Sequence, residues 1–208
     1  MVLQNIASTL ESMGKNINMY HFAPTDTFYD VEEFINREID DERAVTIPEE
    51  DLLASNFLNS EQKNAYNLIL QTLLSNESDA FFIDGPAGTG KTFLYKALLA
   101  TIRSKNMIAL AVASSGVAAS ILPGGRTAHS RFKIPLNADK DSTCNVTKQG
   151  SLAKLLRLTK LIIWDEAPMS TKYSIEALDK MLRDINDIIS LLVAKLLFLV
   201  ETFDKYCL

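Results

Sequence analysis

The sequence predicts an α/β fold with a parallel sheet flanked by helices, because strand-like and helix-like segments alternate between residues 80 and 167. Two continuous apolar runs of strand length, residues 108–113 and 161–164, are typical of strands buried on both faces. A short apolar segment, residues 81–84, is expected to form a third buried strand before a glycine-rich loop and a helix over residues 93–99. Ligands of such sheets bind at the carboxyl ends of the strands.

Residues 1–55 are polar and weakly patterned, so we expect an appendage whose charge runs at 40–43 and 49–51 face solvent. The main domain is expected over residues 56–187. It starts with Asn59-Ser60-Glu61-Gln62, a cap-then-Gln pattern that predicts a helix start. The apolar residues that follow recur at helical spacing: Tyr66, Ile69, Leu70, Leu73 and Leu74.

Two further helices are predicted, one over residues 151–158 and an amphipathic one over residues 173–185. The stripe of the second consists of Ile175, Leu178, Leu182 and Ile185. Residues 188–208 form an apolar tail. Its longest apolar stretch is too short to cross a bilayer as a helix, so no membrane partner is expected.

The loop after the first strand is Gly85-Pro86-Ala87-Gly88-Thr89-Gly90-Lys91-Thr92, which matches G-x-x-x-x-G-K-[ST]. Its glycines allow successive backbone N–H groups to point at a phosphate, and the following helix adds its positive end. Lys91 is suited to the β- and γ-phosphates, and the Thr92 hydroxyl to Mg²⁺. The alternative, a chance glycine-rich turn, is disfavoured by the strand and helix on either side.

Two acids, Asp165 and Glu166, follow the apolar run at residues 161–164. An acid at this position in phosphate-loop ATPases holds Mg²⁺, which suits Asp165, and a second acid can orient and deprotonate water, which suits Glu166. An ordinary acidic pair at a strand end is the alternative. Together with Lys91, the pair predicts ATP or GTP hydrolysis.

Composition sets the frame for these motifs. The chain has 208 residues, of which 47% are hydrophobic and 23% charged, as in a soluble globular protein. The net charge of −5 does not favour a nucleic-acid binder, although an acidic protein can present a local basic groove. The two cysteines, Cys144 and Cys207, have no metal-type spacing, and a reducing compartment such as the cytosol or nucleus is expected.

The chain resembles the petite-integration-frequency (Pif-one-like) DNA helicases of plants and Helitron transposons over residues 57–185. The resemblance rests on the strings FFIDGPAGTGKTFLYKALLATIRS, AVASSGVAASILPGGRTAHSRFKIPLN and LIIWDEAPMSTKYSIEALDKMLRDI, with LNSEQKNAYNLIL before them. It implies a RecA-like P-loop NTPase domain that is incomplete, with the second RecA-like domain absent. It also implies ATP-driven 5′-to-3′ unwinding in DNA repair, recombination and telomere maintenance, in the nucleus or alternatively in the mitochondrion or plastid.

The resemblance also implies roles for individual residues. Gln62 is expected to contact adenine, the loop residues 85–92 to hold ATP, and Thr92 and Asp165 to hold Mg²⁺. Single-stranded DNA is the expected macromolecular partner, and protein partners are left unknown. The DNA contacts are expected from Ser114, Ser115, Gly116, Thr127 and His129.

The residues themselves support the DNA contacts less strongly. Residues 114–116 are also compatible with a plain strand-to-helix turn. Arg126, Arg131 and Lys133 with Phe132 form a basic stretch with an aromatic, the composition of a single-strand groove, whereas His129 alone also fits a structural histidine.

The tail lacks the Gly-Asp-Phe-Arg-Gln motif of the family. One choice of codons for residues 192–208, translated in another frame, gives GGKVVVLGGDFRQILP, which resembles that motif. We therefore expect a frameshift near Leu191, which the transcript sequence checks. The tail is then expected to dock on a sheet edge, to be disordered or to aggregate.

Three functions remain open from the sequence. The first is an ATP-dependent DNA helicase by descent with little motor activity. The second is an inactive nucleotide-binding or interaction module. The third, another phosphate-loop ATPase such as a clamp-loader-like protein, is disfavoured by Gln62 and by the GRTAHS segment.

Overall fold

The structure is a computed structural model that describes residues 31–75, 80–86, 88–186 and 196–200. The chain divides into two compact units, Met1–Phe34 and Ile35–Leu208. The helices are α2 (Val31–Arg43), α3 (Glu49–Leu53), α4 (Ser60–Leu74), α5 (Lys91–Ser104), α6 (Gly116–Ile121), α7 (Ala128–Phe132), α8 (Ser151–Leu158) and α9 (Lys172–Asn186), with short 3-10 turns at Ala54–Asn56 and Ala167–Met169. The strands are β1 (Phe81–Asp84), β2 (Ile108–Ala113), β3 (Arg126–Thr127), β4 (Thr159–Asp165) and β5 (Leu196–Val200).

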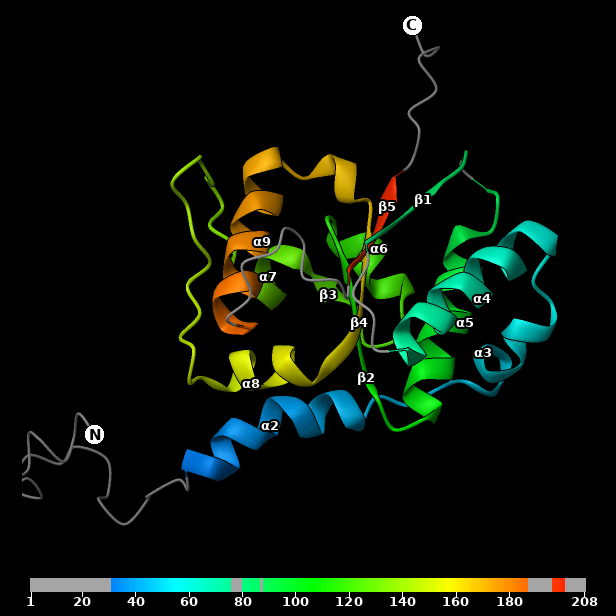
Figure 1. Cartoon of the computed structure of the whole chain (residues 1–208), viewed down its shortest axis with the longest axis horizontal. Helices are drawn as coiled ribbons and strands as arrows, with labels where there is room; N and C mark the ends of the chain where they lie inside the picture. The colour runs from blue at the N-terminus through cyan, green and yellow to red at the C-terminus, as the bar shows by residue number, and fades with distance from the viewer. Residues whose placement is uncertain (1–30, 76–79, 87, 187–195, 201–208) are drawn as a thin grey trace, which may run out of the picture. The chain divides into compact units, whose positions relative to one another are not determined.

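The strands form one sheet in the order β1-β5-β4-β2-β3, and all of their pairings are parallel. Helices α4 and α5 lie on one side of the sheet, and α7, α8 and α9 on the other (Figure 1). This arrangement confirms the predicted α/β fold with a parallel sheet. Because the strands are parallel, their carboxyl ends lie along one edge, where β1 leads into the phosphate loop and β4 into the acidic pair.

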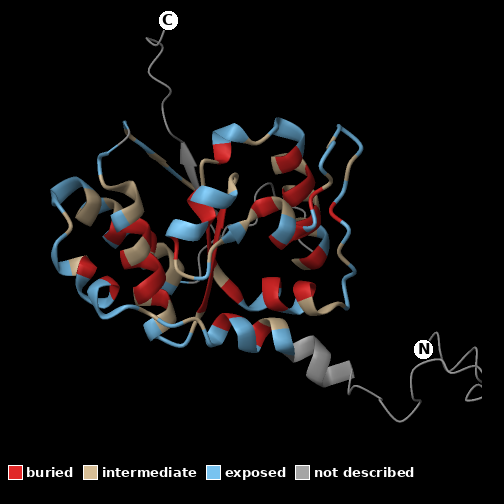
Figure 2. Ribbon diagram, turned by 180° about the vertical axis from the view of Figure 1, so that it is seen from behind, coloured by how far each residue is buried: buried red, intermediate tan, exposed pale blue. Residues whose placement is uncertain are grey.

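The two central strands send alternate side chains into two separate cores, as the two-residue period of a strand requires. Leu110 and Val112 of β2 pack with Trp164 of β4 in the core under α7, α8 and α9. The intervening Ala109 and Ala111 face the core under α4 and α5. Burial therefore concentrates on β2, β4 and the helix faces toward them, as Figure 2 shows.

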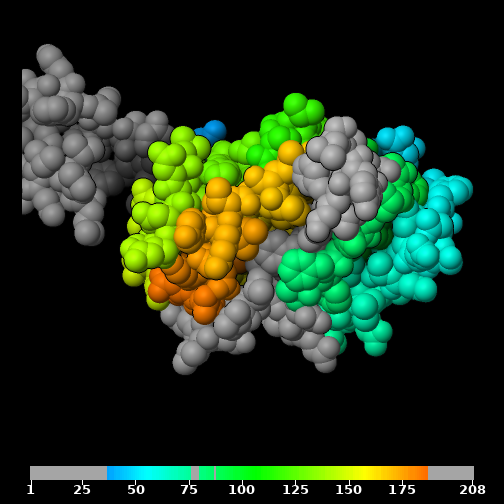
Figure 3. All heavy atoms as spheres, turned by 90° about the horizontal axis from the view of Figure 1, so that it is seen from above, coloured from blue at the N-terminus to red at the C-terminus, as the bar shows by residue number. Residues whose placement is uncertain are grey.

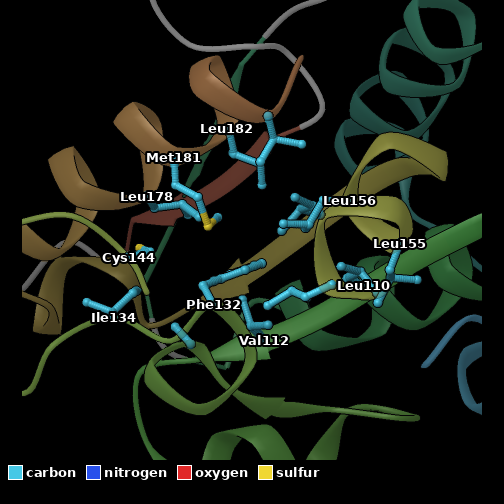
Figure 4. Packing of buried hydrophobic residues seen from close by; sticks show 14 of the residues in the cluster. Leu110, Val112, Phe132, Ile134, Cys144, Leu155, Leu156, Leu178, Met181 and Leu182 are labelled. Atoms are coloured by element: carbon cyan, nitrogen blue, oxygen red, sulfur yellow. The ribbon is translucent and has the colours of Figure 1, made fainter. Parts of the chain in front are cut away.

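The larger core is built around Phe132 and Trp164, whose ring centroids lie 6.3 Å apart and whose planes are inclined by 46°. Leu155, Leu178 and Met181 close it from the helices (Figure 4). Cys144 lies at its margin, where burial raises the pKa of the thiol to about 12. Apolar surroundings thus keep this thiol protonated and structural.

The region before residue 56 differs from the expected appendage. The compact unit that contains the sheet begins at Ile35, and the side chains of Ile39 and Ala54 are buried in its two cores. The charge runs were expected to face solvent, and this is wrong for Glu42 and Asp51, which are 6% and 5% exposed. Each run lies in a helix, α2 or α3, so one side of it faces the protein.

The first strand is also less covered than predicted. Phe81–Asp84 does form β1, but its residues alternate between half-buried and exposed, and the Phe82 side chain is 63% exposed. The expectation of a buried strand is therefore wrong for Phe82 and Asp84. By contrast, α8 and α9 form where the patterns predict them, with Leu178, Leu182 and Ile185 buried.

Residues 196–200 of the tail form β5, which lies inside the sheet and not on its edge. Phe81 pairs with Leu197 on one side of β5, and Ile162 pairs with Leu196 on the other. The rest of the tail, residues 188–195 and 201–208, lies outside the described residues. The frameshift stays a prediction. Within the described ranges, no helix combines the length and apolar character that crossing a membrane requires.

Candidate active site

The loop between β1 and α5 has the backbone that its glycines predict. Gly88 and Gly90 both adopt φ of +80°, a conformation that glycine reaches without steric cost. Gly90 is also the N-cap of α5, so Lys91 and Thr92 occupy its first turn. This places the positive end of the helix at the loop. Ala87 lies outside the described residues.

Lys91 bridges the loop. Its ammonium donates hydrogen bonds to the carbonyl oxygens of Gly85 (2.6 Å) and Pro86 (2.9 Å), while the Thr89 hydroxyl also donates to Pro86 (2.9 Å). The charge is therefore fixed at the loop, which is where a nucleotide phosphate would need it.

A cavity of about 650 Å³ opens beside this loop and falls within the size range of small-molecule sites. Lys91 and Thr89 line it on the loop side, and Gln62 and Asn59 on the side of α4. Figure 3 looks onto this end of the molecule, with the α4–α5 part in cyan to green and the α9 part in orange on opposite sides. The cavity thus joins two segments that the sequence assigned to one ligand.

Gln62 uses both ends of its carboxamide. The carbonyl oxygen accepts from the Asn59 backbone N–H (3.0 Å), and Asn59 returns a bond to the Gln62 N–H (2.9 Å), which completes a capping box. The amide group donates to the carbonyl oxygens of Thr89 (3.1 Å) and Gly90 (3.3 Å). Gln62 therefore ties the start of α4 to the phosphate loop, in addition to lining the cavity in which adenine contact was predicted.

Gly90→Ala is expected to push Gln62 off the loop. A Cβ at position 90 would lie 2.7 Å from Gln62 Nε2, whereas a Cβ at Gly88, which has the same φ, meets nothing within 4 Å. Both variants carry the cost of left-handed backbone, about 1–2 kcal/mol. Gly90→Ala also loses the Gln62 hydrogen bonds, so we expect its free energy of unfolding, measured in urea, to fall about 1 kcal/mol further than that of Gly88→Ala. Equal losses would show that the Gln62 contact is unimportant.

The acidic pair lies at the carboxyl end of β4. Asp165 pairs with Ala113 of β2, and its Oδ1 accepts the Glu166 backbone N–H (3.0 Å). Glu166 adopts φ of +54°, which is uncommon for a residue other than glycine. The Glu166 carbonyl oxygen accepts from the Ser114 hydroxyl (2.7 Å) and from the Met169 N–H (3.0 Å). The structure therefore holds Glu166 in a strained conformation by bonds on both sides of its backbone.

Ser114 connects the two central strands. Its single O–H is donated to the Glu166 carbonyl, and its oxygen accepts from Trp164 Nε1 at 3.0 Å. The Ser170 hydroxyl lies 2.8 Å away and must be the donor in that pair. The predicted DNA contact of Ser114 would have to compete with this network, which favours a role in holding the end of β4.

Ser115 contacts the acidic pair directly. Its hydroxyl donates to Glu166 Oε2 at 2.7 Å, and the same oxygen accepts the Ala118 N–H (3.1 Å) as the N-cap of α6. Gly116 follows as the exposed first residue of that helix. Sequence reasoning missed the Ser115–Glu166 bond because 51 positions separate the two residues.

Thr127 and His129 lie one strand further along. Thr127 pairs with Ala113, so Thr127, Ala113 and Asp165 form one row across β3, β2 and β4. The Thr127 side chain caps α7, and both it and His129 are partly exposed. The predicted DNA residues and the acidic pair therefore lie together at the carboxyl ends of the strands.

The basic stretch with an aromatic residue does not form the expected groove. Phe132 is fully buried against Trp164, and Arg131 is 3% exposed and paired with Glu42. Only Arg126 and Lys133 of that stretch are exposed. The physical reason is that the five-residue helix α7 turns its Phe132 side into the core.

Thr92 and Asp165 fit a magnesium site of the kind completed by a nucleotide. Mg²⁺ is commonly held by one or two protein groups together with phosphate oxygens, and a hydroxyl with a carboxylate is such a set. In the part of the chain that the structure describes, no three His, Cys, Asp or Glu side chains gather as a metal site. Mg²⁺ held by such a set takes its remaining ligands from phosphate oxygens and water.

Comparisons with known proteins agree on one family. A family model described as PIF1-like helicase matches residues 57–192. The ATP-dependent DNA helicase PIF4 of Trypanosoma brucei brucei is 29% identical over 135 residues, which cover 63% of this chain and 16% of the relative. The ATP-dependent DNA helicase PIF1 of the same organism is 32% identical over 129 residues, which cover 61% of this chain and 12% of the relative.

Solved structures give the same result. The crystal structure of Bacteroides Pif1 bound to ssDNA has a TM-score of 0.58 and 27% identity, covering 70% of this chain and 32% of that one. The Bacteroides Pif1 complex with ADP-AlF3 and ssDNA has a TM-score of 0.56 and 28% identity, covering 68% and 31%. This likeness confirms the expected RecA-like fold. The chain spans less than a fifth of the curated relatives and about a third of these solved chains.

Proposed function

Since this chain belongs to the PIF1-like helicase family, we propose that it provides the ATP-binding part of an ATP-dependent DNA helicase that moves 5′ to 3′ on single-stranded DNA. The observation on which this rests is the cavity that unites Gln62, the phosphate loop and Lys91. ATP and ssDNA are the proposed partners, in keeping with the solved Pif1 complexes with ssDNA and ADP-AlF3. DNA repair, recombination and telomere maintenance are the proposed processes, in the nucleus or alternatively in the mitochondrion or plastid.

The proposed chemistry is hydrolysis of the bond to the γ-phosphate. Magnesium bound with ATP supplies charge neutralisation at the phosphates. Lys91 adds a fixed positive charge, since two loop carbonyls hold its ammonium in place. Thr92 would offer a hydroxyl and Asp165 a carboxylate to the metal. Glu166 would accept the proton of the attacking water, as the acid that directly follows β4 at the carboxyl end of the sheet.

An inactive nucleotide-binding module is the alternative, and one observation favours considering it. The segment matched in the solved chains is only about a third of their length, so the segment by itself is expected to bind ATP while turning it over slowly. Transition-state charge in such enzymes is often stabilised by an arginine from another domain or protein, worth about 10³–10⁵ in rate.

The test is ATP binding and hydrolysis by the purified chain, with and without an oligothymidylate. We expect a fluorescent ATP analogue to bind the wild-type chain and to bind Lys91→Ala much more weakly. Slow hydrolysis that ssDNA accelerates, and that Lys91→Ala abolishes, would support the helicase proposal. Nucleotide binding with no response to DNA would favour the inactive module, and strong unwinding by this chain alone would contradict the expected low motor activity.

A further inference from the structure

We propose that Ser115 is a latch that holds the Glu166 carboxylate away from the phosphate loop until single-stranded DNA takes its hydroxyl. This inference rests on the proposed function, because it assigns a regulator to the same hydrolytic site. Ser115 would thus be a positioning residue. It would act through Glu166, and it would link the DNA-facing end of β2 to ATP hydrolysis.

The hydrogen bond between Ser115 and Glu166 lies on the side of β4 away from the phosphate loop. The sheet order places β2 directly beside β4 on one side, whereas β1 and its phosphate loop lie on the other side of β4, beyond β5. Ser115 follows β2, and its hydroxyl lies 2.7 Å from Glu166 Oε2. The bond therefore draws the carboxylate toward β2, which is the side opposite to the predicted phosphates.

The hydrogen-bonding capacity of a serine limits what Ser115 can bind at one time. A hydroxyl has one proton to donate and can accept through its lone pairs. The Ser115 oxygen already accepts a hydrogen bond from the Ala118 N–H, and its single O–H donates to Glu166 Oε2. A DNA phosphate oxygen can only accept a hydrogen bond. It can therefore bind the Ser115 hydroxyl only by replacing Glu166 as the acceptor of the Ser115 O–H.

Among the residues that the structure describes, the other hydrogen bonds of Glu166 are made by its backbone. Asp165, Ser114 and Met169 fix its N–H and its carbonyl oxygen. Release of Ser115 would therefore free the carboxylate without moving the main chain of the site. Ser114 is the natural comparison, because its hydroxyl contacts the same residue at the backbone and not at the carboxylate.

The latch predicts a coupling between Ser115 and Glu166 in DNA binding that does not depend on hydrolysis. In Glu166→Ala no hydrogen bond to a carboxylate has to be broken before the Ser115 hydroxyl can bind DNA. The affinity for a labelled oligothymidylate should therefore rise about fivefold at fixed salt. In a Ser115→Ala background the same Glu166→Ala change should give only the small gain due to the lost negative charge. Fluorescence anisotropy on the wild type, both single variants and the double variant measures this cycle.

Two variants separate the latch from a structural role of Ser115. Ser115→Thr keeps both the cap of α6 and the O–H donor, and should behave as wild type. Ser170→Ala removes a hydroxyl from the neighbouring network without touching the carboxylate, and should leave the coupling unchanged. Where the chain turns over ATP, Ser115→Ala should also raise hydrolysis without DNA and reduce its stimulation by DNA.

The outcomes are distinct. A gain from Glu166→Ala that is clearly larger in the wild type than in Ser115→Ala, and is restored in Ser115→Thr, supports the latch. Oligothymidylate binding with additive effects overturns the latch and leaves the proposed function in place. Absence of oligothymidylate binding in all four proteins overturns the latch together with the DNA part of the proposed function, whereas ATP-analogue binding tests the nucleotide part separately.

Discussion

A Glu42→Ala variant is expected to unfold with a free energy about 3–5 kcal/mol lower than that of the wild type, because it leaves a buried charge without its partner. Glu42 pairs with Arg131, and their side chains are 3% and 1% exposed. Burial lowers the pKa of the Arg131 guanidinium, and Glu42 opposes that shift. Burial likewise lowers the pKa of Arg103, which Glu42 raises and Arg131 lowers. Glu42 thus favours the charged forms of two arginines, the buried Arg131 and the half-buried Arg103.

Urea unfolding of matched variants tests this. Asp41→Ala, one position earlier on the exposed side of α2, should change the free energy of unfolding by less than about 0.5 kcal/mol. The double variant Glu42→Leu with Arg131→Met should recover most of the loss, since apolar side chains of similar size often replace buried ion pairs at little cost. Among the described residues, Glu42 Oε2 and Arg131 Nε have no hydrogen-bond partner, which favours such recovery. A loss below about 1 kcal/mol for Glu42→Ala would contradict the argument.

The Glu42–Arg131 ion pair could not be predicted from the sequence. Glu42 lies in a charge run and Arg131 in a basic stretch, and both patterns are typical of solvated surface. Their pairing joins residues 89 positions apart, and no local periodicity encodes such a contact. The burial of Phe132 was missed for the same reason, because its place in the core depends on how α7 lies against Trp164.

Local patterns did predict the central elements. The continuous apolar runs predicted β2 and β4. Both faces of each strand are covered, so consecutive side chains are apolar on either face. The Asn59–Gln62 pattern gave the start of α4, since a capping box is made within four residues of chain. The same pattern could not show that the other end of the Gln62 carboxamide reaches Thr89 and Gly90 across 27 and 28 positions.

Strand β5 could not be predicted from the sequence, because the apolar composition of the tail did not specify its position in the fold. The tail was expected to dock on a sheet edge, to be disordered or to aggregate. The structure instead places residues 196–200 between β1 and β4. Strand β1 pairs with β5 in the described sheet, so the phosphate loop and the acidic pair are linked through this strand. A parallel strand added from a distant segment leaves no signal in the sequence of its neighbours.

Glu166→Gln is expected to slow ATP hydrolysis by about 10²–10⁴-fold while leaving nucleotide affinity nearly unchanged, because the amide cannot accept the proton of the attacking water. The substitution conserves shape, and its amide oxygen can still accept the Ser115 hydroxyl that Glu166 Oε2 now accepts. The backbone bonds to Asp165 and Ser114 do not involve the side chain of residue 166. The fold should therefore be retained.

Single-turnover hydrolysis and binding of a fluorescent ATP analogue separate these effects. Glu50→Gln, an exposed acid on α3, removes the same charge from the protein and should change neither quantity. A parallel loss of affinity and rate in Glu166→Gln would assign Glu166 to the binding of the nucleotide and its metal. An unchanged rate would move the proton acceptor elsewhere. A lost rate with intact affinity fits only a residue that acts in the transition state, which is the role its place beside Asp165 predicts.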